Sequence, residues 1–356
     1  MKEAGIVGGV LMAHAPQFFT LPETEDKATV ARVETLAVEN GKRLAALEPD
    51  VTIVIANDHA DQFLLQCVPS FALHRGGEAV GTFAGREFRY TVAADLSTAL
   101  IRYLQEEGFD PAFTSNAALD YAFGIPLTFL RTAGPIIPVF VNAYVPPQPR
   151  MERCFAFGQA MRRGLTALGV RAVVVTSGGL SHFPGTDRYA QPDLEFDKKL
   201  VAELSTGNLR WLLSLDEKRL DDTGNIELRC WGVAAGLLGE RKPDLVSLDP
   251  SWHHNYATMA FWSQGAAQKT ELHYPPIAPD QVVLADILHR LAHDVGERAR
   301  FLSNPQAYAD ALAIAPAEKT ALAAMDQSAL LKLGVHPFLP FMAKLQIDRQ
   351  RAGHAT

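Results

Sequence analysis

The sequence predicts an α/β fold, in which a mainly parallel or mixed central sheet is covered by helices and a small all-α domain follows. Three observations support this prediction. Short β-branched runs alternate with longer amphipathic stretches up to about Asp249. After Gln264 the β-branched runs cease, and Pro275, Pro276 and Pro279 interrupt any regular element. The 356 residues suit two domains, since a domain has about 150 residues.

The β-branched runs are expected to form buried strands, at Ile6–Met12, Val51–Ala56, Ile136–Asn142, Ala172–Thr176 and Leu245–Leu248. The first run also resembles a secretory signal peptide, because Ala13-His14-Ala15 matches a cleavage pattern. Glycines dilute this run, and Glu3 opposes the positive charge that a signal peptide carries at its start. We therefore interpret it as the first strand.

The amphipathic stretches are expected to form helices. Apolar residues from Val30 to Leu47 recur at helical spacing after the acidic turn at residues 23–26, which predicts a crossover helix between the first two strands. Later helices are expected at Ala94–Glu107, Met151–Leu168, Asp193–Leu204 and Ile226–Leu238.

We place a domain boundary between a catalytic domain, residues 1–270, and a helical domain, residues 271–356. In the second domain one helix is expected at Asp280–Leu302. Asn304-Pro305 and Pro316 each begin a further helix, and Gly334 ends a short fourth one.

Charge and cysteine content exclude several classes of partner. The chain has 33 basic and 40 acidic residues, a net charge of −7, so it lacks the basic excess that nucleic acids and anionic membranes attract. No apolar run approaches the ~20 residues that span a bilayer. The cysteines, Cys67, Cys154 and Cys230, are odd in number and form no CxxC pair, which favours a reducing cytoplasm.

Three histidines follow predicted strands, namely His14, His59 and His182. The carboxyl ends of parallel strands line the ligand crevice of an α/β sheet, so these imidazoles are expected to converge. Each one alone is more often a hydrogen-bonded histidine near the core. Together they indicate metal binding or acid/base chemistry.

Two histidines and one carboxylate can hold Fe(II) with positions left open. Glu227 is the candidate carboxylate. Asn225 is expected to be the N-cap of its helix, which would place Glu227 in the first helical turn. An ordinary acidic residue at a helix start is the alternative interpretation.

Four motifs resemble those of the class III extradiol ring-cleaving dioxygenases, the group that contains the catalytic subunit of protocatechuate 4,5-dioxygenase. They are His14 in Ala-His-Ala-Pro, Asn57-Asp58-His59-Ala60, Ser177–His182 and Ile226-Glu227-Leu228. The resemblance spans about Gly5 to Gly265. It implies that His14, His59 and Glu227 hold Fe(II) and that His182 is an acid/base residue. Phe301–Leu345 resembles the small helical subunit of these enzymes, which implies a fused domain that covers the active site.

One position departs from the family, which has a second active-site histidine where this chain has Tyr121. A phenol is a poor base at neutral pH but can donate a hydrogen bond. We expect Tyr121 to act as this donor, or the substrate to arrive already acidic. Asp58 is expected to orient a metal ligand, and Ser181 and Asn255 to support the ligands or the substrate. For His253-His254, beside Asn255, a surface pair is the alternative.

These observations predict an Fe(II)-dependent dioxygenase that inserts both atoms of O2 to open the ring of a catechol-type, dihydroxypyridine or hydroxypyridone substrate. A zinc hydrolase with the same ligands and a non-catalytic binding protein on this scaffold are the alternatives, because residue types do not separate iron from zinc. The expected partners are the small aromatic substrate, O2 and a second copy of the chain in a homodimer, with no nucleic acid and no membrane.

Overall fold

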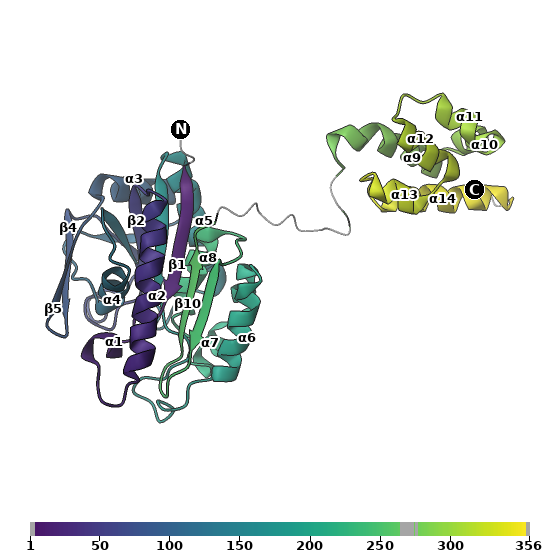
Figure 1. Cartoon of the computed structure of the whole chain (residues 1–356). Helices are drawn as coiled ribbons and strands as arrows, with labels where there is room; N and C mark the ends of the chain where they lie inside the picture. The colour runs from purple at the N-terminus through teal and green to yellow at the C-terminus, as the bar shows by residue number, and fades with distance from the viewer. Residues whose placement is uncertain (1–3, 264–273, 275–276, 354–356) are drawn as a thin grey trace. The chain divides into compact units, whose positions relative to one another are not determined.

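The computed structural model describes residues 4–263, 274 and 277–353. The chain divides into two compact units, Met1–Gln268 and Lys269–Thr356 (Figure 1). The expected boundary at 270/271 lies outside the described residues. None of the described helices combines the length and the apolarity that crossing a membrane requires.

The larger unit is built on a mixed eight-stranded sheet, which confirms the predicted fold class. Its strands are β1 (Gly5–Met12), β2 (Val51–Ala56), β3 (Phe71–His74), β6 (Ala112–Thr114), β7 (Ile136–Val141), β8 (Arg171–Ser177), β9 (Leu245–Asp249) and β10 (Tyr256–Phe261). They lie in the order β6-β3-β7-β2-β8-β1-β10-β9. The central strands β7, β2, β8 and β1 are parallel, whereas β3, β10 and β9 each run antiparallel to a neighbour. The carboxyl ends of the four central strands therefore meet at one edge.

Helices cover both faces of this sheet (Figure 1). They are α1 (Gln17–Thr20), α2 (Lys27–Ala46), α3 (Ala94–Glu106), α4 (Tyr121–Phe129), α5 (Met151–Ala167), α6 (Leu194–Ser205), α7 (Glu217–Asp222) and α8 (Leu228–Leu238), with the 3-10 helix η1 (Leu209–Ser214). Successive residues of a strand face opposite sides. In β2, Ile53 and Ile55 pack with α3, α5 and α8, while Val54 and Ala56 pack with α2 and α4.

Helices α5 and α8 pack unusually closely through two glycines. A Cβ atom on Gly158 would lie 2.0 Å from the carbonyl oxygen of Val233, and one on Gly236 would lie 2.1 Å from that of Phe155. No side chain fits at such distances, so the two backbones approach directly. This packing fixes α8, and Glu227 lies immediately before its first residue.

The predicted strands are confirmed, and the predicted helices of the larger unit are confirmed to within about three residues at each end. Several elements were not predicted. The hairpin of β4 (Glu78–Phe83) and β5 (Arg86–Thr91) is half exposed and polar, so it lacks the apolar run of a buried strand. Helix α4 is apolar almost throughout and contains Pro126, which hides its helical period.

The smaller unit is entirely helical within the residues described, which confirms the expected all-α region. Its elements are η2 (Pro279–Gln281), α9 (Val282–His293), α10 (Val295–Ser303), α11 (Pro305–Asp310), α12 (Pro316–Ala324), α13 (Gln327–Lys332) and α14 (Phe338–Arg351). The single helix expected at Asp280–Leu302 is wrong. Asp294 adopts an extended conformation, and its side chain caps α10 by accepting a hydrogen bond from the amide of Glu297 at 2.9 Å.

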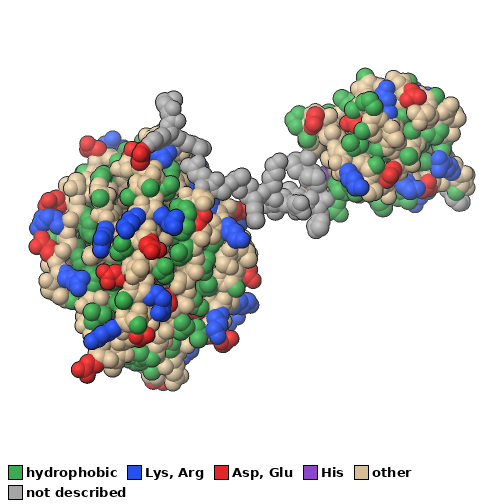
Figure 2. All heavy atoms as spheres, in the orientation of Figure 1, with side chains coloured by type: hydrophobic (Ala, Val, Ile, Leu, Met, Phe, Trp, Pro, Cys, Tyr) green, Lys and Arg blue, Asp and Glu red, His purple; other side chains and the backbone are tan. Residues whose placement is uncertain are grey.

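The surface of the larger unit is mixed in charge on the face that Figure 2 presents, where acidic and basic side chains are interspersed with apolar atoms. That face shows no continuous basic patch of the kind that would attract a phosphate backbone.

Candidate metal centre

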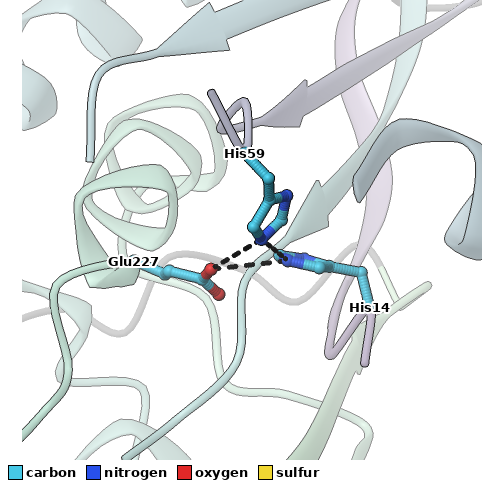
Figure 3. A group of neighbouring side chains, drawn as sticks. All are labelled: His14, His59 and Glu227. Carbon is cyan, nitrogen blue, oxygen red and sulfur yellow. Dashed lines mark hydrogen bonds and ion pairs between the residues drawn. The ribbon is translucent and has the colours of Figure 1, made fainter. Parts of the chain in front are cut away.

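His14, His59 and Glu227 converge at the carboxyl edge of the sheet. His14 follows β1 and His59 follows β2, while Glu227 stands at the N-terminal end of α8. The Nε2 atoms of the two histidines are 3.4 Å apart, and they lie 3.4 and 3.7 Å from Oε1 of Glu227. Figure 3 shows the three side chains pointing toward one another. Their donor atoms lie within 4.8 Å of one another, so one ion can contact all three.

The far nitrogen of each imidazole has its own partner. Nδ1 of His14 lies 2.7 Å from Oγ of Ser177, the last residue of β8. Nδ1 of His59 donates to Oδ1 of Asp120 at 2.9 Å, and the backbone amide of His59 donates to Oδ2 at the same distance. A hydrogen bond of this kind orients a ligand ring and leaves the Nε2 lone pair for a metal.

Charges around His59 shift its pKa strongly. Burial opposes the imidazolium, but the hydrogen bonds to Asp120 and Glu227 outweigh burial and raise the pKa of His59 to about 9. Burial likewise opposes the charge of Asp120, but the His59 partner holds the pKa of Asp120 below its ordinary value. Protons therefore compete with a metal ion for His59, because a ligating imidazole has to be neutral.

The carboxylate of Glu227 is fully buried and is held by donors on both oxygens. Oε2 accepts a hydrogen bond from the amide of Gly179 at 2.6 Å. Oε1 accepts from the hydroxyl of Tyr144 at 2.8 Å and from Nδ2 of Asn57 at 3.3 Å. Burial opposes ionisation of this group, but the charges of His14 and His182 and the hydrogen bonds with His14 and His59 hold the pKa of Glu227 well below its ordinary value. The centre is thus built around a carboxylate that stays charged.

The expected helix cap at Asn225 is wrong. The N-cap position of α8 is Glu227 itself, so its carboxylate stands just before the first turn. Asn225 instead turns its amide nitrogen to Asp197 at 3.0 Å. The side chain of Glu227 gives α8 no capping hydrogen bond, because both of its oxygens face the centre.

His182 joins the same cluster from the β8–α6 connection. Its Nδ1 donates to the carbonyl oxygen of Leu180 at 2.7 Å, which leaves Nε2 as the acceptor. Nε2 lies 3.2 Å from the Tyr144 hydroxyl and 3.7 Å from Oε1 of Glu227. Burial lowers the pKa of His182, so its neutral form is favoured.

His254 stacks on His182, with ring centroids 4.1 Å apart and planes 12° apart. Both His253 and His254 are buried, so the surface pair considered for them is wrong. A Cβ atom on Gly179 would lie 1.7 Å from Nε2 of His254, which means that the His254 ring occupies the space of a side chain at position 179. Burial holds the pKa of His254 well below its ordinary value, so the ring packs as a neutral one.

Tyr121 lies beside the histidines as the first residue of α4. Its ring stacks on His59 at 4.3 Å and contacts His14 edge-on at 5.9 Å. Burial, with the charges of Asp120 and Glu227, raises the pKa of Tyr121 far above neutrality, so its hydroxyl keeps its proton. A phenol that keeps its proton can donate a hydrogen bond.

The remaining predicted residues surround the cluster. Asp58 accepts backbone hydrogen bonds from Asp61 and Gln62 and so holds the loop after His59, while the contact expected of Asp58, to a ligand ring, is made by Asp120. The hydroxyl of Ser181 donates to the carbonyl oxygen of Thr223 at 2.6 Å. Asn255 donates from Nδ2 to Asp197 at 2.8 Å.

The sequence reasoning missed Asp120, Tyr144 and His254 as parts of this cluster. A signal existed for Tyr144, because it follows the predicted strand Ile136–Asn142 just as the histidines follow theirs. Nothing in the local sequence connects Asp120 with His59, since 61 residues separate them.

The fold and the cluster define a class: an α/β protein with a two-histidine, one-carboxylate centre at the carboxyl edge of its sheet. Residues 8–262 match the family described as the catalytic LigB subunit of aromatic ring-opening dioxygenase. The chain therefore belongs to the LigB family. Residues 284–350 match the LigA subunit of the aromatic-ring-opening dioxygenase LigAB, which agrees with the resemblance noted for the tail.

The chain is also similar to curated relatives. It is 31% identical over 194 residues to a 2,3-dihydroxyphenylpropionate/2,3-dihydroxicinnamic acid 1,2-dioxygenase of Klebsiella pneumoniae, covering 53% of this chain and 61% of the relative. It is 29% identical over 233 residues to the protein of the same name from Escherichia coli K12, covering 65% and 70%. The chain thus spans about three fifths of the length of the first of these. The crystal structure of an uncharacterized Escherichia coli K12 protein has a TM-score of 0.49 and 12% identity, over 71% of this chain and 99% of that one.

Proposed function

We propose that the protein is an Fe(II)-dependent extradiol dioxygenase, which inserts both atoms of O2 into an aromatic ring beside a vicinal pair of hydroxyl groups. One observation carries the proposal. In a chain of the LigB family, two imidazole nitrogens and one carboxylate oxygen meet within 4.8 Å. This ligand set is the one that non-haem Fe(II) oxygenases use. The curated relatives are named as 1,2-dioxygenases of 2,3-dihydroxyphenylpropionate and 2,3-dihydroxicinnamic acid, and these names also support a substrate with adjacent hydroxyl groups.

The donor set fits a divalent ion. Both Nε2 atoms face Glu227, and the far nitrogens of the two rings are already engaged. Iron bound by His14, His59 and Glu227 would acidify the hydroxyls of a chelating substrate and leave positions for O2 beside it. Proton transfer and the stabilisation of developing charge would be supplied by side chains of the protein.

Proton handling falls to His182 in this proposal. Its Nδ1 is committed to the carbonyl of Leu180, so Nε2 is free to accept a proton from a substrate hydroxyl near the centre. Its lowered pKa keeps the ring neutral at pH 7 and ready to act as a base. The Tyr144 hydroxyl lies 3.2 Å from the same Nε2 and donates its proton to Oε1 of Glu227, so it connects the proposed base with the carboxylate.

Tyr121 would act as a donor only. Its raised pKa excludes a phenolate near neutral pH, so it can stabilise developing negative charge on an oxygen but cannot remove a proton. A catechol, or a dihydroxypyridine or hydroxypyridone that ionises more easily, suits a centre with a single imidazole base. We therefore place the substrate among these rings.

The test is an oxygen-electrode screen of the Fe(II)-reconstituted protein against dihydroxylated benzenes, dihydroxypyridines and hydroxypyridones, with Glu227→Ala as the control. Uptake of one O2 per ring opened, lost in the control, supports the proposal. Activity as a hydrolase with Zn²⁺ and none with Fe(II) would contradict it. An iron-loaded protein that consumes no O2 with any of these rings would instead indicate a binding protein.

We further propose a homodimer in the cytoplasm. Residues 8–262 match a LigB subunit and residues 284–350 match a LigA subunit, so one chain carries both parts of a LigAB pair, and the proposed homodimer would join two such chains. Cys67, Cys154 and Cys230 are all free, which suits a reducing compartment. Light scattering coupled to gel filtration measures the mass, and a monomer of 38.8 kDa would refute the dimer.

A further inference from the structure

A second buried carboxylate, Asp197, lies on α6 outside the metal-ligand cluster. Its exposed fraction is 0%, although α6 as a whole lies at the surface. Three side-chain or backbone donors converge on it. Oδ2 accepts from the amide of Ser181 at 3.1 Å and from Nδ2 of Asn255 at 2.8 Å, and Oδ1 accepts from Nδ2 of Asn225 at 3.0 Å.

Each of these donors is a near neighbour in sequence of a residue that the centre uses. Ser181 precedes His182, Asn225 stands two residues before Glu227, and Asn255 follows His254. The three segments are separated by many residues, yet one carboxylate contacts all of them. The position of each segment relative to the other two is therefore tied to Asp197.

The amide side chains depend on Asp197 for their orientation. Oδ1 of Asn225 and Oδ1 of Asn255 are both buried and have no hydrogen-bond partner among the described residues. The amide nitrogens thus provide the side-chain hydrogen bonds, two of them to Asp197 and one from Asn225 to the carbonyl of Thr223 at 3.2 Å. Without the carboxylate, the Asn255 amide would lose its described partner.

Backbone contacts between the same segments show how closely they are joined. The amide of His182 donates to the carbonyl oxygen of Gly224 at 3.1 Å, and the amide of Leu180 donates to the carbonyl oxygen of Asn255 at 3.3 Å. The Ser181 hydroxyl donates to the carbonyl of Thr223 and accepts from the amide of Asp193 at 2.7 Å. A shift of one segment would therefore move the others.

We propose that Asp197 is a positioning residue, which fixes Glu227 and His182 relative to each other and so sets the affinity and the geometry of the metal centre. The inference rests on the proposed function only in requiring that Glu227 bind a divalent ion. It is independent of which ring is opened. Residues that hydrogen-bond a metal ligand directly change metal affinity by about 10- to 100-fold in other metal sites, and Asp197 acts one step further out, through the segments that carry the ligands.

Cobalt(II) is the probe, because its visible spectrum reports the geometry of its ligands and no turnover is required. The whole chain is titrated anaerobically with Co(II) as wild type, Asp197→Ala and Asp197→Asn. Asp193→Ala is the matched control: Asp193 caps the same helix through Phe196, but its carboxylate contacts none of the three segments.

We expect Asp197→Ala to weaken Co(II) binding at least 10-fold and to alter the spectrum. Asp197→Asn keeps one oxygen, and its NH2 can pair with the free Oδ1 of a turned Asn225 or Asn255, so its loss is expected to be smaller. Asp193→Ala is expected to lie within twofold of wild type with an unchanged spectrum, because it weakens α6 alone.

The inference is overturned if both Asp197 variants bind Co(II) like wild type with the same spectrum, or if Asp193→Ala changes the spectrum as much as they do. If Asp197→Ala does not fold, Asp197→Asn alone decides between these outcomes. Wild-type protein that binds Co(II) but opens no ring would refute the proposed activity and leave the role of Asp197 standing. Wild-type protein that binds no Co(II) would overturn both.

Discussion

Replacing Asp120 by asparagine should weaken metal binding while leaving the fold intact. The carboxylate accepts from Nδ1 of His59 at 2.9 Å and from the backbone amide of His59 at 2.9 Å. The amide of Ala122 donates to Oδ1 as well, at 2.7 Å, and an asparagine has one oxygen for these three donors. If that oxygen stays with the imidazole, its NH2 meets the backbone N–H of His59, and two donors face each other.

The magnitude follows from what is lost. One charge-assisted hydrogen bond disappears, and the orientation of the His59 ring is weakened. Such supporting contacts change metal affinity by about 10- to 100-fold, which corresponds to about 1.4 to 2.7 kcal/mol in binding free energy. The loss of negative charge also lowers the pKa of His59, which reduces competition from protons and keeps the net effect toward the lower end.

The assay is an anaerobic competition between the protein and a chromophoric chelator for Fe(II) at pH 7.5. Asp58→Asn is the matched control, because Asp58 is one residue from His59 but its described contacts go to the following loop. The Asp58→Asn protein should be less stable to unfolding than wild type but should bind Fe(II) with the same affinity. The reasoning is refuted if Asp120→Asn binds Fe(II) like wild type, or if Asp58→Asn weakens binding as much.

Three further changes test separate parts of the site. Gly179→Ala places a methyl group 1.7 Å from His254, so the free energy of unfolding measured in urea should fall by about 1 to 3 kcal/mol. Gly77 has open space around it, so Gly77→Ala should be nearly neutral. Equal effects of the two substitutions would contradict the close packing at Gly179. Burial raises the pKa of Asp197 from 3.8 to about 7, so the folded chain keeps a proton that the unfolded chain has lost, and this group's contribution to stability falls as pH rises from 4 to 7. From pH 5 to 7 wild type should therefore lose about 2 kcal/mol more than Asp197→Asn, and parallel curves would show that Asp197 is already ionised at pH 5. Tyr121→Phe keeps the ring on His59, so Fe(II) affinity should hold while O2 uptake falls about 100-fold. Unchanged uptake would show that the hydroxyl takes no part in the reaction.

The central part of the fold could be predicted because buried parallel strands have continuous apolar sequences, as in Val51–Ala56. It also predicted which strand ends carry His14 and His59. The half-exposed hairpin and the apolar helix α4 lack such a pattern. Their positions depend on tertiary contacts, which local periodicity does not contain.

The ligand cluster could be proposed from residue types, but its supports could not. His59 and Asp120 are 61 residues apart, and the orientation of one by the other follows from the approach of α4 to the end of β2. The same holds for Asp197, whose three partners come from separate connections. The helix cap was misassigned at Asn225 because both asparagine and glutamate are common at helix starts, and only the buried network decides between their roles.

The central claim is that His14, His59 and Glu227 hold one divalent ion. Metal analysis of anaerobically Fe(II)-loaded, desalted protein tests it most directly, with Glu227→Ala beside the wild type. We expect about one iron per chain in wild type and nearly none in the variant, because the variant loses the only charged ligand of the three. Equal iron content in both proteins, or none in wild type, would contradict the account.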